Sequence, residues 1–507
     1  VDPLLTQCVM PTEYRNYDPA LHPLAEARNY TSALNAAKME RMFAKPFLAN
    51  LNGHTDSVSC MAKHPTQVEY VYSGGYDGLI KVWNLAERNC VKTYSCTENR
   101  IEGLTTSHTA PGQPYLYSVG SDMTLRQWSL DPTGPNKATN TVVWERTMVG
   151  VDHSWHEPLL ATCGQAVDVW VPGHSQPSHT YKWGNDTQHC VRFNPIEPNI
   201  LATTASDRSI TLYDTRSKEG IRKIVMAMRS NELSWNPMEA YIFTVANEDY
   251  KLYSYDLRKL DVALHVYMDH ISAVMSVDYA PTGKEFISGS YDKTIRIYRT
   301  NHGHSREVYH TKRMQRVSNV IWTLDNKYVL SSSDEFNIRL WKARAHEKLG
   351  EKYCVIPPSA VMYGLYCAQV SYREKISLDQ REKLKEKYKY FPEVSRILRH
   401  RHIPQHIYNG ASENRTMLQS RKRKEANRRA HSKAGTMPYI CLHASLSQQC
   451  PLSWVIALHW KMAAVRMLFI LEMDQNLGRI FNGSTGRFSW TSPPIRCYTS
   501  QISTSTL

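Results

Sequence analysis

Short runs of alternating apolar and polar residues recur along the first two thirds of the chain, and seven of them end in the same way. Each run follows a polar turn, has the alternation typical of a β-strand, and closes on Trp or Tyr. The closing residues are Trp83, Trp128, Trp170, Tyr213, Tyr255, Tyr298 and Trp341. They lie 42 to 45 positions apart. This period is typical of four-stranded sheets repeated around an axis, and because one such sheet cannot bury both of its faces alone, we expect a closed ring.

One further strand-like segment precedes the first repeat. Residues 47–51, FLANL, lie directly before Gly53-His54 and have no partner strand within the first repeat. We expect this strand to join the last sheet as its outer strand, which closes the ring and limits exposed strand edges. The sequence therefore predicts an all-β, seven-bladed propeller over residues 47–345.

The polar residues of the repeats resemble those of the WD-repeat family, whose blades are held by a histidine, a strand hydroxyl, a turn aspartate and a strand tryptophan. The first repeat matches best, with His54, Ser73, Asp77 and Trp83. The resemblance implies turn anchors at Asp122, Asp207, Asp249, Asp292 and Asp334, and strand tryptophans at Trp128 and Trp341. The third repeat has Gly164 where the aspartate is expected, and beyond His54 only His270 fits the histidine position. We interpret these aspartates as structural anchors, not as catalytic acids.

Signatures of catalysis are missing from the sequence. It contains no glycine-rich phosphate loop, no nucleophile elbow and no His-Glu-x-x-His motif. The 11 cysteines include no Cys-x-x-Cys pair, and His153 and His156 have no third ligand nearby in the sequence. A glycosidase-type propeller would need two carboxylates at its centre, and the sequence alone cannot place such a pair. We therefore expect a protein that is not an enzyme and has no metal, no cofactor and no small-molecule substrate.

Charge is concentrated near the C-terminus. Residues 373–433 contain 18 Lys and Arg and 7 Asp and Glu, a net charge of +11 out of +14 for the whole chain. The pattern predicts two helices separated at Pro404, the first over about 381–402. The second carries a basic run at Arg421, Lys422, Arg423, Lys424, Arg428 and Arg429. Such a run is typical of RNA binding or nuclear import. We expect the interleaved Tyr388, Tyr390 and Phe391 to pack the first helix onto the propeller, although stacking on RNA bases remains an alternative.

Several blocks outside the repeats resemble one WD-repeat subfamily. They are RNYDPALHP at 15–23, ALNA at 33–36, FAKPFL at 43–48, HTKRMQ at 310–315, KLKEK at 383–387 and RHRH at 399–402. The combination is similar to the suppressor-of-fibrillarin family of the small-subunit processome, also described as cullin-4-associated factors. The resemblance implies a non-catalytic scaffold in small ribosomal subunit biogenesis, located in the nucleus and nucleolus. Its implied partner is the pre-ribosomal particle, with its proteins and pre-rRNA.

A second function remains open, that of substrate receptor of a cullin-4 ubiquitin ligase. Tyr213-Asp214-Thr215-Arg216 and Tyr255-Asp256-Leu257-Arg258 match the Trp/Tyr-Asp-x-Arg box of such receptors. In this interpretation Asp214, Arg216, Asp256 and Arg258 bind the cullin-4 adaptor. The alternative is that each aspartate simply holds its arginine within the blade. The two functions are compatible with each other.

The expected division of the chain is an N-terminal extension at 1–46, the propeller at 47–345, a linker with an apolar insertion at 346–372, a basic helical segment at 373–436 and an atypical tail at 437–507. Residues 1–12, 351–372 and 437–507 depart from the family pattern, so whether they are normally translated is open. Residues 453–473 are apolar, but Lys461 and Arg466 lie among them. Each charge would cost roughly 2.5–3.5 kcal/mol at a bilayer centre, so we expect no membrane span.

Overall fold

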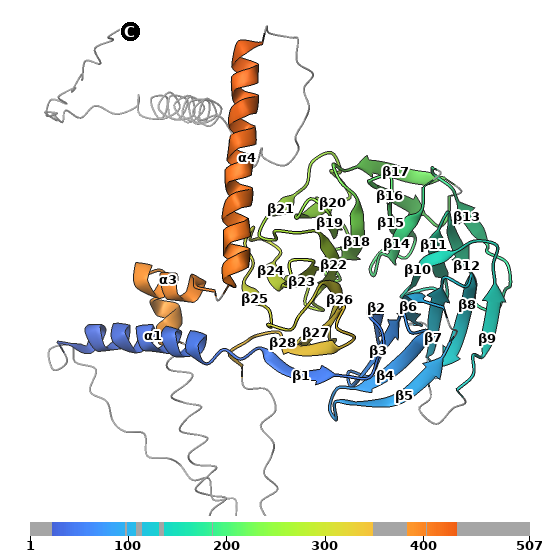
Figure 1. The fold of residues 1–507 in the computed structure, drawn as a ribbon, viewed down its shortest axis with the longest axis horizontal. Coiled ribbons are helices and arrows are strands. Elements are labelled where there is room, and N and C mark those ends of the chain that lie inside the picture. The colour runs from blue at the N-terminus through green and yellow to red at the C-terminus, as the bar shows by residue number, and fades with distance from the viewer. Residues whose placement is uncertain are drawn as a thin grey trace, which may run out of the picture. The chain divides into compact units, whose positions relative to one another are not determined.

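Seven four-stranded antiparallel sheets, here called blades 1 to 7, are arranged in a ring (Figure 1). The computed structural model describes residues 23–96, 99–107, 114–130, 136–184, 186–217, 219–347, 383–401 and 403–432. Within each blade the strands follow one another in sequence order, and the first strands of neighbouring blades pack side by side. The predicted fold class is confirmed.

The strands are short and similar in length from blade to blade. Blade 1 contains β2 (Val58–Lys63), β3 (Tyr70–Gly75), β4 (Leu79–Asn84) and β5 (Asn89–Ser95); blade 2 contains β6 (Ile101–Thr106), β7 (Tyr115–Gly120), β8 (Thr124–Ser129) and β9 (Asn140–Val143). Blade 3 contains β10 (Met148–His153), β11 (Leu160–Gly164), β12 (Val167–Trp170) and β13 (His179–Tyr181); blade 4 contains β14 (Gln188–Phe193), β15 (Ile200–Ala205), β16 (Ser209–Asp214) and β17 (Gly220–Val225). Blade 5 contains β18 (Ser230–Trp235), β19 (Ile242–Asn247), β20 (Leu252–Asp256) and β21 (His265–Tyr267); blade 6 contains β22 (Val274–Tyr279), β23 (Glu285–Ser290), β24 (Ile295–Arg299) and β25 (Glu307–Tyr309). Blade 7 contains β26 (Val317–Trp322), β27 (Tyr328–Ser333) and β28 (Ile338–Lys342), together with β1 (Phe47–Leu51).

The two ends of the ring meet in blade 7. The strand β1 pairs antiparallel with β28, so that Phe47 lies opposite Trp341 and Leu51 opposite Ile338 (Figure 1). Leu51 is 1% exposed, and the rings of Phe47 and Trp341 are 5.6 Å apart. The predicted closure by the N-terminal strand is therefore confirmed.

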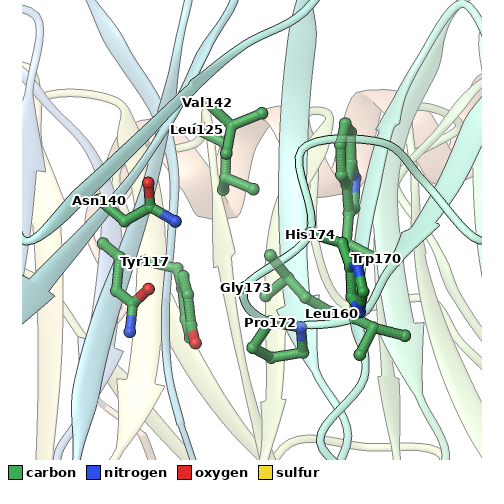
Figure 2. A pocket seen from close by; sticks show the side chains of 11 residues that line it. Tyr117, Leu125, Asn140, Val142, Leu160, Trp170, Pro172, Gly173 and His174 are labelled. Carbon is green, nitrogen blue, oxygen red and sulfur yellow. The ribbon is translucent and has the colours of Figure 1, made fainter.

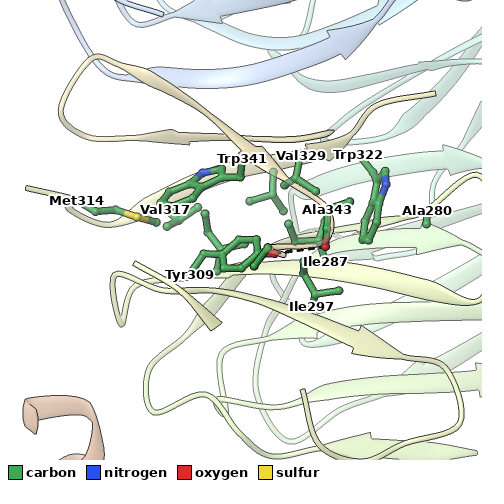
Figure 3. Close-up of a cluster of buried hydrophobic side chains, with 13 residues drawn as sticks. Ala280, Ile287, Ile297, Tyr309, Met314, Val317, Trp322, Val329, Trp341 and Ala343 are labelled. Carbon is green, nitrogen blue, oxygen red and sulfur yellow. Dashed lines mark hydrogen bonds between the residues drawn. The ribbon is translucent and has the colours of Figure 1, made fainter. Parts of the chain in front are cut away.

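The core lies between neighbouring blades, because each sheet is covered on both faces. The largest buried cluster joins blades 6 and 7 (Figure 3). In it the Tyr309 ring stacks on Trp341 with centroids 5.6 Å apart, and the Tyr309 hydroxyl donates to the backbone oxygen of Ala343 at 3.3 Å. Met314, which belongs to the connection between the two blades, is also buried there. Each closing aromatic residue lies on the third strand of its blade, which explains the period seen in the sequence.

Three labelled helices lie outside the strands: α1 (Ala25–Met42), α3 (Pro392–Arg399) and α4 (Gln405–His431). The single helix that we predicted over about 381–402 was wrong. Residues 383–387 are helical, residues 388–391 form a turn, and α3 begins at Pro392. Proline disfavours helical geometry in the preceding residue, and Phe391 is indeed extended, with φ −66° and ψ 137°. The predicted break at Pro404 is confirmed, since Pro404 caps α4.

The helix α1 packs against the C-terminal segment. Ala33 and Ala37 of α1 are buried with Tyr388 and Val394. The Tyr30 ring lies 5.9 Å from that of Tyr388 and 5.5 Å from that of Phe391. The expected packing of Tyr388 and Phe391 on the propeller is thus replaced by packing on α1, and Tyr390 is exposed.

Several predictions fall outside the described residues. They concern residues 1–12, 351–372 and 437–507, the apolar stretch 453–473, and the block at 15–23 apart from Pro23. Within the described ranges, no helix has the length and apolar character needed to cross a membrane.

Candidate functional site

The polar set of blade 1 forms a closed network. His54 Nδ1 lies 2.9 Å from Asp77 Oδ2, and His54 Nε2 lies 2.7 Å from Ser73 Oγ. Trp83 Nε1 donates to the same Ser73 oxygen at 2.7 Å. Burial alone would raise the pKa of Asp77, but its contacts with His54 and two backbone N–H groups lower it. Every member is bonded to another member, and His54, Ser73 and Trp83 are buried, so the network stiffens the blade.

Blade 6 repeats this network with a tyrosine at the tryptophan position. His270 Nδ1 lies 2.8 Å from Asp292 Oδ2, and His270 Nε2 lies 2.6 Å from Ser288 Oγ. Tyr298 replaces the tryptophan, and its buried hydroxyl has no hydrogen-bond partner among the described residues. His270 thus occupies the position that the WD-repeat resemblance implied.

Most of the aspartates singled out in the sequence share one local geometry. The carboxylate accepts the backbone N–H of the residue two positions on, which is a turn-stabilising contact. This holds for Asp77, Asp122, Asp207, Asp249 and Asp292, at 2.9 to 3.3 Å. Trp128 and Trp341 each donate from the indole to a serine oxygen of the neighbouring strand at 2.9 Å.

Asp334 lies one position away from the expected anchor. In blade 7 it is Glu335 that pairs with Arg339, four residues on, as Asp122 pairs with Arg126 in blade 2. The register places Trp341 opposite Val329, so Glu335 occupies the position of Asp77 and Asp334 that of Tyr76. The side chain of Asp334 is exposed.

Blade 3 has no aspartate in the turn between its second and third strands and has a buried aspartate on its third strand. Its turn after Gly164 is shorter, and β12 carries the acid: Asp168 is buried at the strand position where blade 2 has Arg126. Asp168 accepts hydrogen bonds from Thr180 at 2.7 Å and from Trp144 Nε1 at 3.1 Å. Sequence reasoning missed Asp168, although a lone acid inside an otherwise apolar strand was visible.

Carboxylates on the innermost strands are held by bases from other blades. Arg192 lies 3.8 Å from Asp152 and 2.6 Å from Glu232, and Lys63 lies 2.5 Å from Asp278. Burial raises the pKa of Asp152, against the effect of Arg192. The first set joins blades 3, 4 and 5 and the second joins blades 1 and 6, and in both sets the carboxylates are paired with basic side chains.

Two pockets lie at blades 2 and 3, and the larger has a volume of about 710 Å³, is open to solvent and is lined by Trp144, Glu145, Arg146, Gln176, Pro177, Thr180 and Lys182. The smaller pocket has a volume of about 20 Å³ and is lined by residues such as Tyr117, Leu160, Trp170 and His174 (Figure 2). That volume is sufficient for a water molecule, whereas sites for small molecules are typically about 300–1,000 Å³. The residues that the structure describes include no group of three or more His, Cys, Asp or Glu side chains that could hold a metal ion.

The two arginines of the candidate adaptor box lie on neighbouring blades. Arg216 follows β16, and Arg258 follows β20. Each guanidinium is held by the aspartate two residues earlier, with Nη2 3.1 Å from Asp214 Oδ2 and 2.8 Å from Asp256 Oδ2. The arginine side chains are nevertheless 71% and 67% exposed. Each aspartate therefore orients a guanidinium that still faces solvent.

The basic run lies on a helix that is attached to the ring only at its beginning. Ile407 is buried, and Asn414 Nδ2 donates to the backbone oxygen of Ile271 in the connection before blade 6, at 3.5 Å. From Arg415 to His431 every residue except Glu425 is exposed. The bases Arg421, Lys422, Arg423, Lys424, Arg428 and Arg429 all belong to this exposed part.

Charged side chains hold α1 and the residues before α4 against blade 6. Arg41, at the end of α1, lies 3.1 Å from both carboxylate oxygens of Glu307 in β25 and also donates to the backbone oxygen of Leu398 in α3. Arg401, between α3 and α4, donates to Ser305 Oγ at 3.3 Å and lies 4.0 Å from Asp269. The end of α1 and the residues between α3 and α4 are thus joined to the outer edge of blade 6. These contacts could not be predicted from the sequence, because their partners are more than 90 residues apart.

Comparison with known proteins agrees with this architecture. Residues 367–444 match the Sof1-like domain, and residues 45–84 and 262–299 match the WD domain, G-beta repeat. The solved WD40 β-propeller domain of Doa1 superimposes with a TM-score of 0.50 at 16% identity, over 59% of this chain and 96% of that one. This last likeness concerns the fold alone.

The sequence relatives are much closer. DDB1- and CUL4-associated factor 13 of Xenopus tropicalis is 48% identical over 427 residues, which is 84% of this chain and 91% of that protein. The human protein of the same name is also 48% identical, over 84% and 92%. Protein SOF1 of Saccharomyces cerevisiae is 41% identical over 84% of this chain and 88% of its own length. The chain therefore belongs to the family of Protein SOF1 and DDB1- and CUL4-associated factor 13.

Proposed function

We propose that this protein is a non-catalytic scaffold of the small-subunit processome, where it supports pre-rRNA processing in the nucleolus. Family membership and the suppressor-of-fibrillarin blocks in the sequence support this function. The ring contributes rigidity, because its polar groups are engaged in turn anchors and ion pairs between blades. The observation that carries the proposal is the exposed basic part of α4.

The distribution of charge on α4 favours RNA as its partner. Residues 415–432 contain seven bases and one acid. Four bases are consecutive, at 421–424, and since a helix has 3.6 residues per turn, they point to all sides of it. A flat acidic protein surface would contact only one side of such a helix. Phosphates that line a groove or surround a junction in folded RNA can contact several sides at once.

The proposal is tested by reversing the charge of Arg421, Lys422, Arg423, Lys424, Arg428 and Arg429 to Glu in the full chain. Glutamate is a good helix former, so α4 is expected to remain helical. We expect the variant to leave the large pre-ribosomal fractions of a sedimentation gradient while the thermal midpoint of the ring is unchanged. Because the same run is a candidate import signal, an unrelated import signal is added to both proteins.

The matched control reverses six exposed bases on the ring, Arg88, Lys137, Lys182, Arg222, Lys259 and Lys284. It should sediment with pre-ribosomes as the wild type does. A charge-reversed α4 that enters the nucleolus and still sediments with pre-ribosomes would show that α4 does not attach the protein to the particle.

A second function, adaptor binding in a cullin-4 ubiquitin ligase, is favoured by a separate observation. Arg216 and Arg258 present exposed, oriented guanidinium groups on adjacent blades. An oriented guanidinium makes forked hydrogen bonds to carboxylates and carbonyls at low entropic cost. The name of the 48% identical relatives links those proteins to DDB1 and CUL4.

The test is the double variant Arg216→Ala with Arg258→Ala. Exposed ion pairs contribute little to stability, so the thermal midpoint should not change. Co-purification of DDB1 should be lost, and it should persist in a control with Arg222→Ala and Arg299→Ala, two exposed arginines of blades 4 and 6. If DDB1 co-purifies at the wild-type level with the double variant, the aspartate–arginine pairs only stabilise the turns.

A further inference from the structure

A second basic surface lies on the ring beside the base of α4, and we propose that it binds the same RNA as α4. The surface, here called the blade 6–7 patch, consists of Tyr291, Lys293, Lys312, Arg313 and Arg316. This inference rests on the proposed function and extends it, because the sequence placed RNA contacts only in the C-terminal segment. The ring is close to neutral as a whole, but its charge is not evenly spread.

The patch is built from two connections that meet between blades 6 and 7. Tyr291 and Lys293 belong to the turn between β23 and β24, and the other three bases belong to the connection between β25 and β26. The guanidinium carbon of Arg316 lies 5.2 Å from the centre of the Tyr291 ring, so the two connections are in contact.

One buried residue fixes the orientation of the second connection. Met314 is 1% exposed and packs into the core cluster beside Tyr309 and Trp341 (Figure 3). Its neighbours Lys312, Arg313 and Arg316 are all exposed, because the anchored methionine leaves them on the solvent side. Of the acids in the adjoining turns, Asp292 is paired with His270 and Glu335 with Arg339, whereas Asp334 is exposed and its backbone N–H donates to the backbone oxygen of Arg316 at 3.2 Å, so the patch keeps a net positive charge.

The patch lies close to the first turns of α4. Asn414 of α4 contacts the backbone oxygen of Ile271, and α4 approaches so closely at Gly410 that an added Cβ there would lie 3.1 Å from Ile271 Cδ1. The backbone N–H of Ile271 in turn donates to Asp292 at 3.4 Å, and Asp292 lies between Tyr291 and Lys293 in the turn. Ile271 and Asp292 therefore connect α4 with the patch through direct contacts.

The chemistry of the patch fits RNA. Four basic side chains can contact RNA phosphates. Tyr291, 39% exposed, offers a ring on which an unpaired nucleobase can stack. Two RNA-binding sites on one chain bind a single RNA that reaches both more tightly than either site alone, since the second binding step is intramolecular. An acidic protein segment would use the bases but would not require the tyrosine ring.

The test measures the affinity of the purified full chain for a labelled single-stranded RNA across a salt series. The patch variant carries Lys293→Gln, Lys312→Gln, Arg313→Gln and Arg316→Gln. A log–log salt slope of about −0.7 per phosphate contact predicts a slope shallower by about 2–3 and an affinity at least about tenfold lower at moderate salt. Tyr291→Leu should weaken binding without changing the slope.

The matched control removes the same charge with the same residue types, as Lys137→Gln, Lys182→Gln, Arg208→Gln and Arg222→Gln on blades 2 to 4, and should bind as the wild type does. Thermal midpoints of all variants confirm that they are folded. The charge-reversed α4 variant is measured in parallel. If that variant is weakened while the patch variant binds normally, the patch proposal is refuted and the proposed function stands. If neither is weakened, direct RNA binding fails for both.

Discussion

Asp292 shows how a single carboxylate holds a turn of this ring in place. It receives His270, the backbone N–H of Thr294 at 2.9 Å and the Thr294 hydroxyl at 2.5 Å. Burial alone would raise its pKa, but the charge and hydrogen bond of His270, with Arg296 and Thr294, lower the pKa to about 2. The folded-state pKa lies below the ordinary value of 3.8, so the stabilisation is complete above about pH 4 and is lost as the pH falls towards 2.

We predict that Asp292→Asn lowers the free energy of unfolding at pH 7 by about 1–3 kcal/mol. The difference between wild type and variant should shrink as the pH falls from 4 to 2, because the wild-type carboxylate is then protonated. Denaturant unfolding at several pH values measures this. The control Asp334→Asn changes an exposed carboxylate and should have little effect at any pH. A deficit of Asp292→Asn that is equally large at pH 7 and pH 2 would contradict the account.

For single residues, the sequence predicted which type of side chain stabilises the turns better than it predicted the exact position of that side chain. The turn aspartates were recognisable because each stands before an alternating run that ends in an aromatic residue. Asp334 and Glu335 are both acidic, and only the strand register shows that Glu335 has the anchor position. Asp168 has a different partner set in a shortened turn, and no repeat pattern contains it.

Among the elements, β1 makes the largest single contribution to closure. Its pairing with β28 covers an edge that would otherwise be open, and it buries Leu51. The strand was predictable from its alternation and its lack of a partner. The helix α1 was missed, although its small residues Ala33 and Ala37 are four positions apart, because the pattern by itself does not say what they pack against. Their partners come from residues 384–398.

We predict that removing β1 destabilises the whole ring. A chain that starts at Gly53 should unfold at a lower temperature than one that starts at Ala44, and both lack α1. Burial of Leu51 alone is worth roughly 2–3 kcal/mol, so the midpoint should fall by more than about 5 °C. Equal midpoints would mean that blade 7 does not depend on its outer strand.

For the whole molecule, the proposed function depends on the position of α4. The sequence predicted the basic run and its separation at Pro404, since both are local. It could not predict that Arg41 and Arg401 join α1 and the segment before α4 to blade 6, nor that Ile271 contacts the first turns of α4. These contacts place the first turns of α4 next to the turn that carries Tyr291 and Lys293.

We propose that the ring is a rigid support and that RNA is bound by α4 together with the adjoining patch. Residue-resolved mapping of ultraviolet crosslinks between the cellular protein and RNA tests this most directly. We predict crosslinked peptides from residues 415–431 and from the connections at 291–293 and 312–316, with pre-rRNA as the attached RNA. Crosslinks confined to blades 1 to 4, or a protein that sediments with pre-ribosomes without any RNA crosslink, would contradict it.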